Sequence, residues 1–472
     1  MAKFHLPTLE EEQLAFWDEK KIFAKLMARK DNPRGKFVFF EGPPTANNKP
    51  GIHHQLTRAY KDVILRYRSM RGHFIERKAG WDTHGLPVEL EVEKKLGFTK
   101  KQDIEAYGIA AFNQQCRANV WTYRDLWEKA TKRIGFWVDL ENPYVTYKNE
   151  YIESLWWILR QIDKSGLLYE GYRVTPHCPR CVTSLSSHEL AQGYKDAEDP
   201  SVFVKFPYDA GRKEYFLVWT TTPWTLPANV ALAVGAEVVY VKAKMKATGE
   251  TLILAKDRLE VLDGEHEITE EIKGADLVHW SYVPLFKTLA AAGSEELKNN
   301  YKVYAADFVS TADGTGIVHI APAFGEDDYR LGQREKLATL ITVDQTGMVT
   351  AEVPGKGKFF KKADAVIQAD LTERGLMYKS GTYTHSYPFC WRCSTPILYY
   401  AKTSWYIRMS ELRERLADNN QKINWIPGHI RDGRFGEWIR DVKDWALSRE
   451  RYWGTPLPIW RCSACDEKTV VS

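Results

Sequence analysis

The sequence has no long apolar run, little net charge and few cysteines. None of its 472 residues belongs to a stretch approaching the roughly eighteen consecutive apolar residues of a membrane-spanning helix. Residues 1–21 have no long apolar core and carry acidic side chains early, which argues against a secretory signal. With 66 basic and 62 acidic residues the net charge is only +4, and this balance neither requires nor excludes an RNA partner.

The seven cysteines comprise three Cys-x-x-Cys pairs and one single residue, Cys116. Such pairing in a long chain without a secretory signal indicates metal binding rather than disulfides, so we expect a reducing, cytoplasmic location and no membrane partner. A chain of this length is too long for one compact core, and two or three domains are expected.

Two cysteine pairs bracket about two hundred residues of different character. Four thiolates satisfy the tetrahedral preference of zinc, so we predict a structural Zn²⁺ site at Cys178, Cys181, Cys390 and Cys393. The alternative is that these thiols are simply small core residues. If a separate domain is inserted between the pairs, its incoming and returning strands must lie side by side, and one zinc ion could hold that neck together. Cys462 and Cys465 would be half of a second, incomplete site.

The segment from Glu41 to Asp62, EGPPTANNKPGIHHQLTRAYKD, combines a loop with the start of a helix. The aromatic run 37–40 before it predicts a buried strand, and apolar spacing from Pro50 onward predicts a helix. Free N–H groups and about half a unit of positive charge point out of a helix start, so we expect phosphate to bind there. His53 and His54 on the first turn could donate to it, although plain surface histidines are the alternative.

Together with GWDTHGLPVE at residues 80–89, this segment resembles the nucleotide-binding signature of class I aminoacyl-tRNA synthetases, specifically the isoleucyl family. The resemblance implies an α/β fold with a Rossmann-like parallel sheet interrupted by a β-rich, β-barrel editing domain. It also implies ATP, accompanied by Mg²⁺, as a substrate, with His53 and His54 as catalytic residues. The ATP-binding residues would be Pro44, Gly51, His53 and His54, and those for the amino acid Pro43 and Asp82. Without the resemblance, Asp82 would be interpreted as a cap of the next element.

The sequence departs from the family at one informative place. The family's first motif runs His-x-Gly-His, whereas here the order is Gly51, Ile52, His53 and His54. Either the loop shifts so that His53 performs the work of the missing histidine, or synthesis is impaired. We favour the first alternative because Pro43 and the other motif residues are in place.

The bracketed residues 196–385 contain short β-prone runs separated by Gly, Asn and Asp turns, which predict a small barrel or sandwich. Two segments within them, FLVWTTTPWTLPANVALAV and GTGIVHIAPAFGEDDYRLG, resemble the post-transfer editing site of the isoleucyl family. The editing residues implied are Thr220, Thr221, Thr222, Thr225, Asn229, His319 and Asp328. Asp328 would hold the ammonium of a misattached amino acid, and the others would position the terminal adenosine and a water. Leucyl and valyl relatives have Thr-Thr-Arg-Pro where this sequence has Thr-Thr-Thr-Pro, which supports isoleucine.

We expect three regions: 1–195 with a leading helix and the first half of the catalytic domain, 196–385 as the editing domain, and 386–472 as the returning neck and start of the second half. The resemblance implies activation of isoleucine with ATP, transfer to tRNA(Ile), hydrolysis of valyl-tRNA(Ile), and a monomer. Isoleucyl enzymes carry a further Lys-Met-Ser-Lys-Ser motif and an anticodon domain, which this sequence lacks. We therefore expect an N-terminal fragment that edits but does not synthesise. A non-catalytic paralogue that binds tRNA or nucleotide is the alternative.

Overall fold

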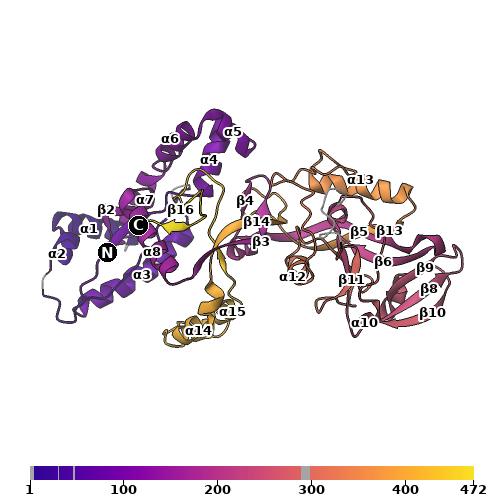
Figure 1. Ribbon diagram of the computed structural model, residues 1–472. Coiled ribbons are helices and arrows are strands. Elements are labelled where there is room, and N and C mark those ends of the chain that lie inside the picture. The colour runs from indigo at the N-terminus through magenta and orange to yellow at the C-terminus, as the bar shows by residue number, and fades with distance from the viewer. Residues whose placement is uncertain (1–4, 30, 46–47, 289–297) are drawn as a thin grey trace. The chain divides into compact units, whose positions relative to one another are not determined.

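The computed structural model describes residues 5–29, 31–45, 48–288 and 298–472. The chain forms two compact units, residues 1–166 with 451–472 and residues 167–450 (Figure 1). None of the described helices is long and apolar enough to cross a membrane. The expected boundaries at 195 and 385 fall inside the second unit and stay predictions.

The first unit is mainly helical. Its helices are α1 (Leu6–Glu19), α2 (Ile22–Met27), α3 (Ile52–Met70), α4 (Leu86–Leu96), α5 (Lys101–Tyr107), α6 (Ile109–Asn119), α7 (Arg124–Arg133) and α8 (Asn149–Lys164). The predicted leading helix is present but breaks in two at Lys21, whose φ of 51° is left-handed. The helix predicted from Pro50 is also present and begins at Ile52.

A short parallel sheet lies at the centre of the first unit. Strand β1 (Lys78–Trp81) pairs in parallel with β2 (Asp139–Val145). Single parallel bridges, Lys36 to Phe74 and Thr45 to Asp82, bring residues 36–45 alongside. This open α/β arrangement agrees with the predicted class. A hairpin of β16 (Ile459–Arg461) and β17 (Lys468–Val470) completes the strands of this unit.

The prediction of a buried strand at residues 37–40 is wrong. The backbone there forms no regular strand, and Val38 and Phe40 are 67% and 86% exposed. Phe37 and Phe39 do pack against the small core around Leu65. Because strand-like side chains alternate between two faces, only one face of this apolar run is covered.

The last residues of the first unit dock onto the motif at 80–89. Arg451 forms ion pairs with Glu89 and Glu93, and both carboxylate side chains are fully buried. The Gly85 N–H donates to the Trp453 carbonyl at 2.8 Å, and the Trp453 indole donates to the Thr83 carbonyl at 2.6 Å. Segments more than three hundred residues apart in sequence therefore hold this motif in place.

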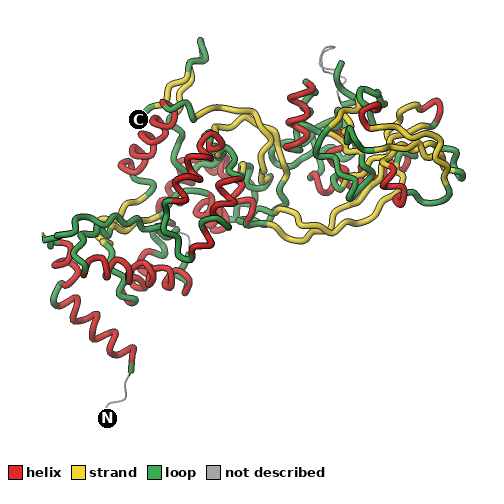
Figure 2. Tube along the Cα trace, turned by 90° about the horizontal axis from the view of Figure 1, so that it is seen from below, coloured by secondary structure: helices red, strands yellow, loops and turns green. Residues whose placement is uncertain are grey.

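The second unit begins with a sheet and a long ribbon. The sheet runs in the order β15-β14-β3-β4, and the ribbon pairs β5 with β13 in antiparallel fashion. The bounds are β3 (Leu168–Cys178), β4 (Thr183–Ser184), β5 (Tyr194–Asp209), β13 (Met377–Pro388), β14 (Leu398–Ile407) and β15 (Trp445–Ala446). Tyr194 lies opposite Pro388, so the incoming and returning strands run side by side, as the two long curved strands in Figure 2 show.

Beyond the ribbon, two sheets pack on a common core. One has the order β10-β8-β9-β6-β5-β13 and the other β11-β7-β12. Their remaining strands are β6 (Glu214–Thr220), β7 (Ala231–Val234), β8 (Val239–Met245), β9 (Thr251–Ala255), β10 (His266–Lys273), β11 (Lys302–Ala305) and β12 (Ile317–Ile320). Val218, Leu232 and Ile317 share one buried cluster. The insert is β-rich as predicted, but in the described residues neither sheet closes into a barrel. The apolar faces are buried by sheet against sheet, which leaves β10 and β13 as open edges.

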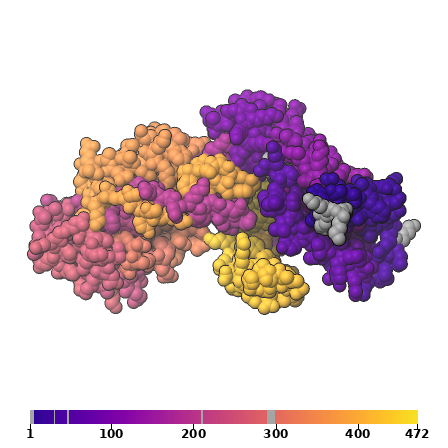
Figure 3. Space-filling view, turned by 180° about the vertical axis from the view of Figure 1, so that it is seen from behind, coloured from indigo at the N-terminus to yellow at the C-terminus, as the bar shows by residue number. Residues whose placement is uncertain are grey.

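The described part of the second unit also contains helices. They are α9 (Ser187–Ala191), α10 (Gly274–Leu277), α12 (Glu326–Glu335), α13 (Phe360–Glu373), α14 (Arg413–Gln421) and α15 (Arg434–Arg440), with 3₁₀ turns η1 (Ala210–Arg212), η2 (Pro223–Ala228), η3 (Lys256–Val261), η4 (Met409–Leu412) and η5 (Gly428–Ile430). Helices α14 and α15 form a small pair that stands out as a yellow lobe in Figure 3.

Candidate functional sites

The first candidate site is the start of α3. Gly51 is the N-cap residue, and its N–H donates to Nδ1 of His54 at 2.9 Å. The His53 and His54 rings lie 3.8 Å apart between centroids. A Cβ atom on Gly51 would meet the His53 ring at 2.8 Å from Cε1 and 3.0 Å from Nδ1. The His53 imidazole therefore occupies the space into which a side chain at position 51 would project.

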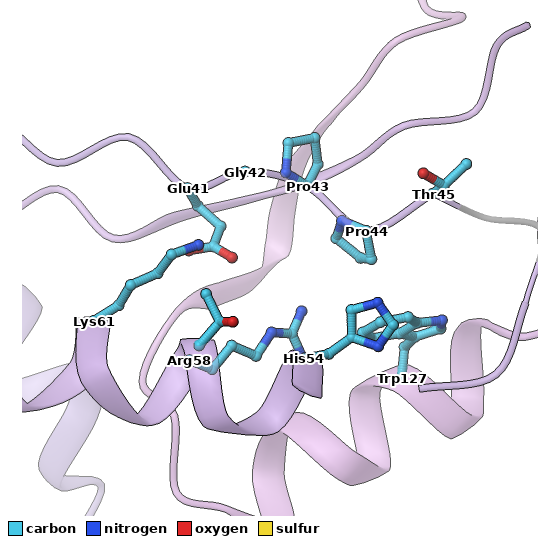
Figure 4. A pocket seen from close by; sticks show the side chains of 10 residues that line it. Glu41, Gly42, Pro43, Pro44, Thr45, His54, Arg58, Lys61 and Trp127 are labelled. Carbon is cyan, nitrogen blue, oxygen red and sulfur yellow. The ribbon is translucent and has the colours of Figure 1, made fainter. Parts of the chain in front are cut away.

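A cavity of about 200 Å³ lies between the loop at 41–45, α3 and α7 (Figure 4). Its lining residues are Glu41, Gly42, Pro43, Pro44, Thr45, His54, Thr57, Arg58, Lys61 and Trp127. Three predicted residues, Pro43, Pro44 and His54, thus come together, whereas Gly51 and His53 lie outside the lining.

Two cationic side chains in this cavity were not predicted. Lys61 forms an ion pair with Glu41 at 3.2 Å, and Arg58 donates to the Thr131 hydroxyl at 2.6 Å. Burial lowers the pKa of the Arg58 guanidinium, and the charge of Glu41 opposes that shift. Burial, followed by the charges of His53 and Arg58, lowers the pKa of His54. This balance favours a neutral His54 in the free protein.

Asp82 lies beside the same loop. Its N–H donates to the Pro44 carbonyl at 3.1 Å, and the Thr45 hydroxyl donates to its carboxylate at 3.5 Å. The motifs at 41–54 and 80–89 therefore meet at the carboxyl end of β1. Residues 46 and 47 of the first motif lie outside the described residues. Ligands bind at such ends in open α/β folds.

The four neck cysteines form the second candidate site. The ligand atoms of Cys178, Cys181, Cys390 and Cys393 all lie within 4.8 Å of one another. Sulfur–sulfur distances of 3.5 Å from Cys178 to Cys393 and 3.6 Å from Cys181 to Cys393 approach the ~3.8 Å edge of a tetrahedron with Zn–S bonds of about 2.3 Å. The cluster could hold a metal ion.

The backbone around the cysteines has the shape of two matching turns. The residue after the second cysteine of each pair, Val182 or Ser394, has a left-handed φ of 50° or 57°. Such a φ is unusual for a β-branched residue like Val182 and persists where the surroundings impose it. Cys462 and Cys465 are exposed and join no such cluster among the described residues.

The third candidate site is in the insert, where hydroxyl groups form a chain. Thr220 ends β6 and its Oγ1 lies 3.2 Å from that of Thr222. The Thr222 Oγ1 is 3.0 Å from the Thr225 Oγ1, which lies 2.9 Å from Nε2 of His319 on β12. Burial lowers the pKa of His319 to about 4. Four of the seven predicted editing residues are therefore connected.

The other three predicted editing residues are placed differently. Asp328 lies in the first turn of α12, where its carboxylate accepts from the Ala321 N–H at 2.8 Å, and burial raises its pKa to about 7. Asn229 faces the core: its amide donates to the Ala231 carbonyl and its oxygen accepts from the Tyr282 hydroxyl. Thr221 is half-buried, and its hydroxyl makes no hydrogen bond to the described part of the chain.

Comparison with known proteins decides the family. The family model of tRNA synthetases class I (I, L, M and V) matches residues 12–472. The chain belongs to this family. It is 52% identical to an isoleucine--tRNA ligase of Dehalococcoides mccartyi, over 98% of this chain and 48% of the relative. It is 50% identical to an isoleucine--tRNA ligase of Thermus thermophilus, over 99% of this chain and 44% of the relative. The chain thus spans about half the length of the curated relatives it matches.

A solved structure of a LeuRS from Agrobacterium radiobacter K84 is 15% identical, covers 98% of this chain and 52% of that chain, and has a TM-score of 0.38.

Two of the cavity residues that were not predicted could have been found from the sequence. Arg58 and Lys61 follow His54 at helical spacing on one face of α3. Asp364 could not. It accepts from the Trp224 N–H at 2.8 Å across 140 residues of sequence, and nothing local in α13 points to that contact.

Proposed function

We propose that this class I synthetase carries the nucleotide-binding region and the proofreading insert of an isoleucine--tRNA ligase. The observation that carries the proposal is the meeting of the motifs at 41–54 and 80–89, where Asp82 bonds to the loop that lines the cavity. The choice of isoleucine is supported by the names of the relatives and by the Thr-Thr-Thr-Pro sequence at residues 220–223. The substrates would be ATP with Mg²⁺, isoleucine and tRNA(Ile).

In the synthetic reaction the isoleucine carboxylate would attack the α-phosphate of ATP and displace pyrophosphate, leaving isoleucyl-adenylate. We propose that Asp82 holds the isoleucine ammonium and that Pro43 contacts its side chain. The start of α3, with His54 and the N–H groups of its first turn, would donate hydrogen bonds to the phosphates, while Pro44 and Gly51 would lie near the base. Such a reaction depends on positioning and charge stabilisation and needs no general base.

We further propose that His53 replaces the histidine that the family carries at position 51. The support is local: its ring lies against Gly51, in the space of the missing side chain. Restoring histidine at position 51 alone should therefore force the two rings to collide, and Gly51→His should lose more ATP–pyrophosphate exchange than Gly51→His combined with His53→Gly. The exchange should be measured with the complete enzyme. Equal loss in the two variants would contradict this role for His53. Inhibitors that imitate isoleucyl-adenylate should bind the natural Gly-x-His-His arrangement more weakly than the double variant.

The insert would hydrolyse valine attached to tRNA(Ile). One methylene in an apolar pocket is worth only about 1–3 kcal/mol, so binding alone cannot exclude valine. The substrate ester is already activated, and the site needs only to orient water. Asp328 is suited to the ammonium because a cation would restore the charge that burial disfavours in the free carboxyl group.

Hydrolysis of valyl-tRNA(Ile) by the 472-residue chain tests this proposal directly. The chain should release valine and spare isoleucyl-tRNA(Ile). Asp328→Ala should abolish release, whereas Asp327→Ala, an exposed neighbour on the same turn, should retain it. A chain that binds tRNA(Ile) but hydrolyses neither ester would instead be the non-catalytic paralogue that the Gly51 and His53 exchange favours. We expect a monomer in the cytoplasm.

The neck cysteines would hold a structural zinc ion. Their sulfur distances and thiolate chemistry fit Zn²⁺, which has no redox role and stabilises folds by fixing four ligands. The ion would tie the incoming strand β3 to the segment after β13 and take no part in either reaction.

A further inference from the structure

The hydroxyl chain in the insert can be assigned hydrogen by hydrogen. The Thr225 hydroxyl has one hydrogen and contacts three groups: the Thr222 carbonyl at 2.8 Å, the Thr222 hydroxyl at 3.0 Å and Nε2 of His319 at 2.9 Å. A carbonyl oxygen can only accept, so the single Thr225 hydrogen points to the Thr222 carbonyl. The other two groups must then donate to the Thr225 oxygen.

This assignment fixes the tautomer of His319. Its Nε2 must carry a hydrogen, because the lone pairs of the Thr225 oxygen face it. Burial lowers the pKa of this imidazole to about 4, so the ring is neutral near pH 7 and its Nδ1 bears a lone pair. The His319 residue is only 8% exposed, and its Nδ1 has no hydrogen-bond partner among the described residues. A buried acceptor left in this state is unfavourable, and a bound donor would satisfy it.

The same count of donors and acceptors limits which hydrogen bonds the threonines can offer to a substrate. The Thr222 hydroxyl donates to Thr225, so the Thr220 hydroxyl donates to Thr222. Thr225 then accepts twice and donates once, which fills its capacity. All three hydroxyl hydrogens are used inside the protein, and Thr225 has nothing left to offer a substrate.

We propose that His319 presents Nδ1 as the hydrogen-bond acceptor for an O–H group at the aminoacyl ester, and that Thr225 is a positioning residue that fixes this tautomer without touching the substrate. The proposal rests on the editing function and deepens it. The O–H group is either the attacking water or the ribose hydroxyl next to the ester. An ammonium group, by contrast, would be drawn to the carboxylate of Asp328.

The tautomer can be read directly. In the 472-residue chain labelled with ¹⁵N-histidine, long-range ¹H–¹⁵N correlation at pH 7 should show His319 with a protonated Nε2 and an unprotonated Nδ1. The resonance is assigned by its loss in His319→Gln. An imidazolium, or a ring protonated at Nδ1, would overturn the proposal. This measurement does not depend on whether the chain hydrolyses valyl-tRNA(Ile), so it separates failure of the tautomer from failure of the editing function.

Hydrolysis then tests the role of Thr225. Thr225→Val keeps the shape but removes the acceptor for Nε2, and should reduce the hydrolysis rate constant about tenfold, equivalent to the ~1.4 kcal/mol of one hydrogen bond, with little change in KM. Thr225→Ser restores the oxygen and should recover most of the rate. Thr372→Val, an exposed threonine on α13, controls for the loss of a hydroxyl. Wild-type rates in Thr225→Val, or equal loss in the valine and serine variants, would refute positioning by the hydroxyl.

The source of the O–H group is resolved with tRNA(Ile) ending in 2′- or 3′-deoxyadenosine. If Nδ1 accepts from the ribose hydroxyl, removing that hydroxyl and replacing His319 by Ala should cause losses that do not multiply. If Nδ1 accepts from water, the two losses should multiply. An unchanged rate in His319→Ala with valyl-tRNA(Ile) that carries both ribose hydroxyls would contradict an acceptor role.

Discussion

The two units differ in how they cover their apolar residues. In residues 167–450 the inward-facing side chains of the strands, such as Val204, Phe216 and Ile253, are fully buried. In the first unit α3 carries a row of exposed apolar residues at helical spacing. They are Ile52, Leu56, Tyr60, Val63, Ile64, Tyr67 and Met70. The second unit is therefore held by a continuous core of its own, whereas the first depends on small clusters and on buried ionic contacts.

The neck should show the largest effect, because it joins the strands on which the core of the second unit is built. Cys393→Ala removes one of four ligands, and binding of a structural zinc ion contributes on the order of 10 kcal/mol to folding. We expect the metal content, measured by mass spectrometry of the purified chain, to fall from one zinc ion to none, with a large drop in the unfolding temperature. Cys116→Ala is the control, since this buried thiol of α6 does not belong to the four-cysteine cluster. Unchanged zinc content in Cys393→Ala would eliminate the site.

The buried ion pairs of the first unit offer the next test. Arg451→Ala leaves Glu89 and Glu93 buried without their partner, and breaking such a pair typically costs about 3–5 kcal/mol. Denaturant unfolding should report this loss. Arg133→Ala, which breaks the exposed pair with Glu10, should cost less than about 1 kcal/mol. Similar losses in the two variants would show that the segment from residue 451 does not stabilise the unit.

Asp364 provides a pH test in the second unit. Burial raises its pKa to about 7, above its ordinary 3.8, so its contribution to stability is present below pH 4 and is lost as the pH rises through 7. Asp364→Asn stays neutral and can still accept from the Trp224 N–H. The free energy of unfolding that this variant gains over the natural chain should therefore be larger at pH 8 than at pH 5. The difference should be on the order of 2 kcal/mol, since each pKa unit is worth about 1.4 kcal/mol.

Thermal unfolding at the two pH values measures this difference. Glu373→Gln, an exposed carboxylate at the end of α13, should show none. The lowered pKa of His319 acts in the opposite direction, stabilising the fold as the pH rises from about 4, but it is common to both chains and cancels. A gain that is equal at the two pH values would mean that Asp364 does not titrate in this range.

Local patterns in the sequence predicted much of this structure. They failed where contacts between distant segments determine the structure. The helix start at Gly51, the β-rich insert and the pairing of β5 with β13 followed from spacing and from the bracketing cysteines. The exposed face of residues 37–40 could not be predicted, because an apolar run does not tell which of its faces is covered. A barrel and a two-sheet packing bury the same alternating residues, so the sequence did not distinguish them. The hydrogen bond that Asn229 accepts from Tyr282 likewise depends on a separate segment of the chain.

The exposed row on α3 should give the smallest effect and tests the comparison most directly. Val63 is 68% exposed, so Val63→Lys should change the free energy of unfolding by less than about 0.5 kcal/mol, whereas Leu65→Ala, two residues away in the core, should cost about 2–5 kcal/mol. A loss comparable to that of Leu65→Ala would mean that the row is covered in solution, and the contrast between the two units would then reflect a missing contact rather than two ways of holding a fold.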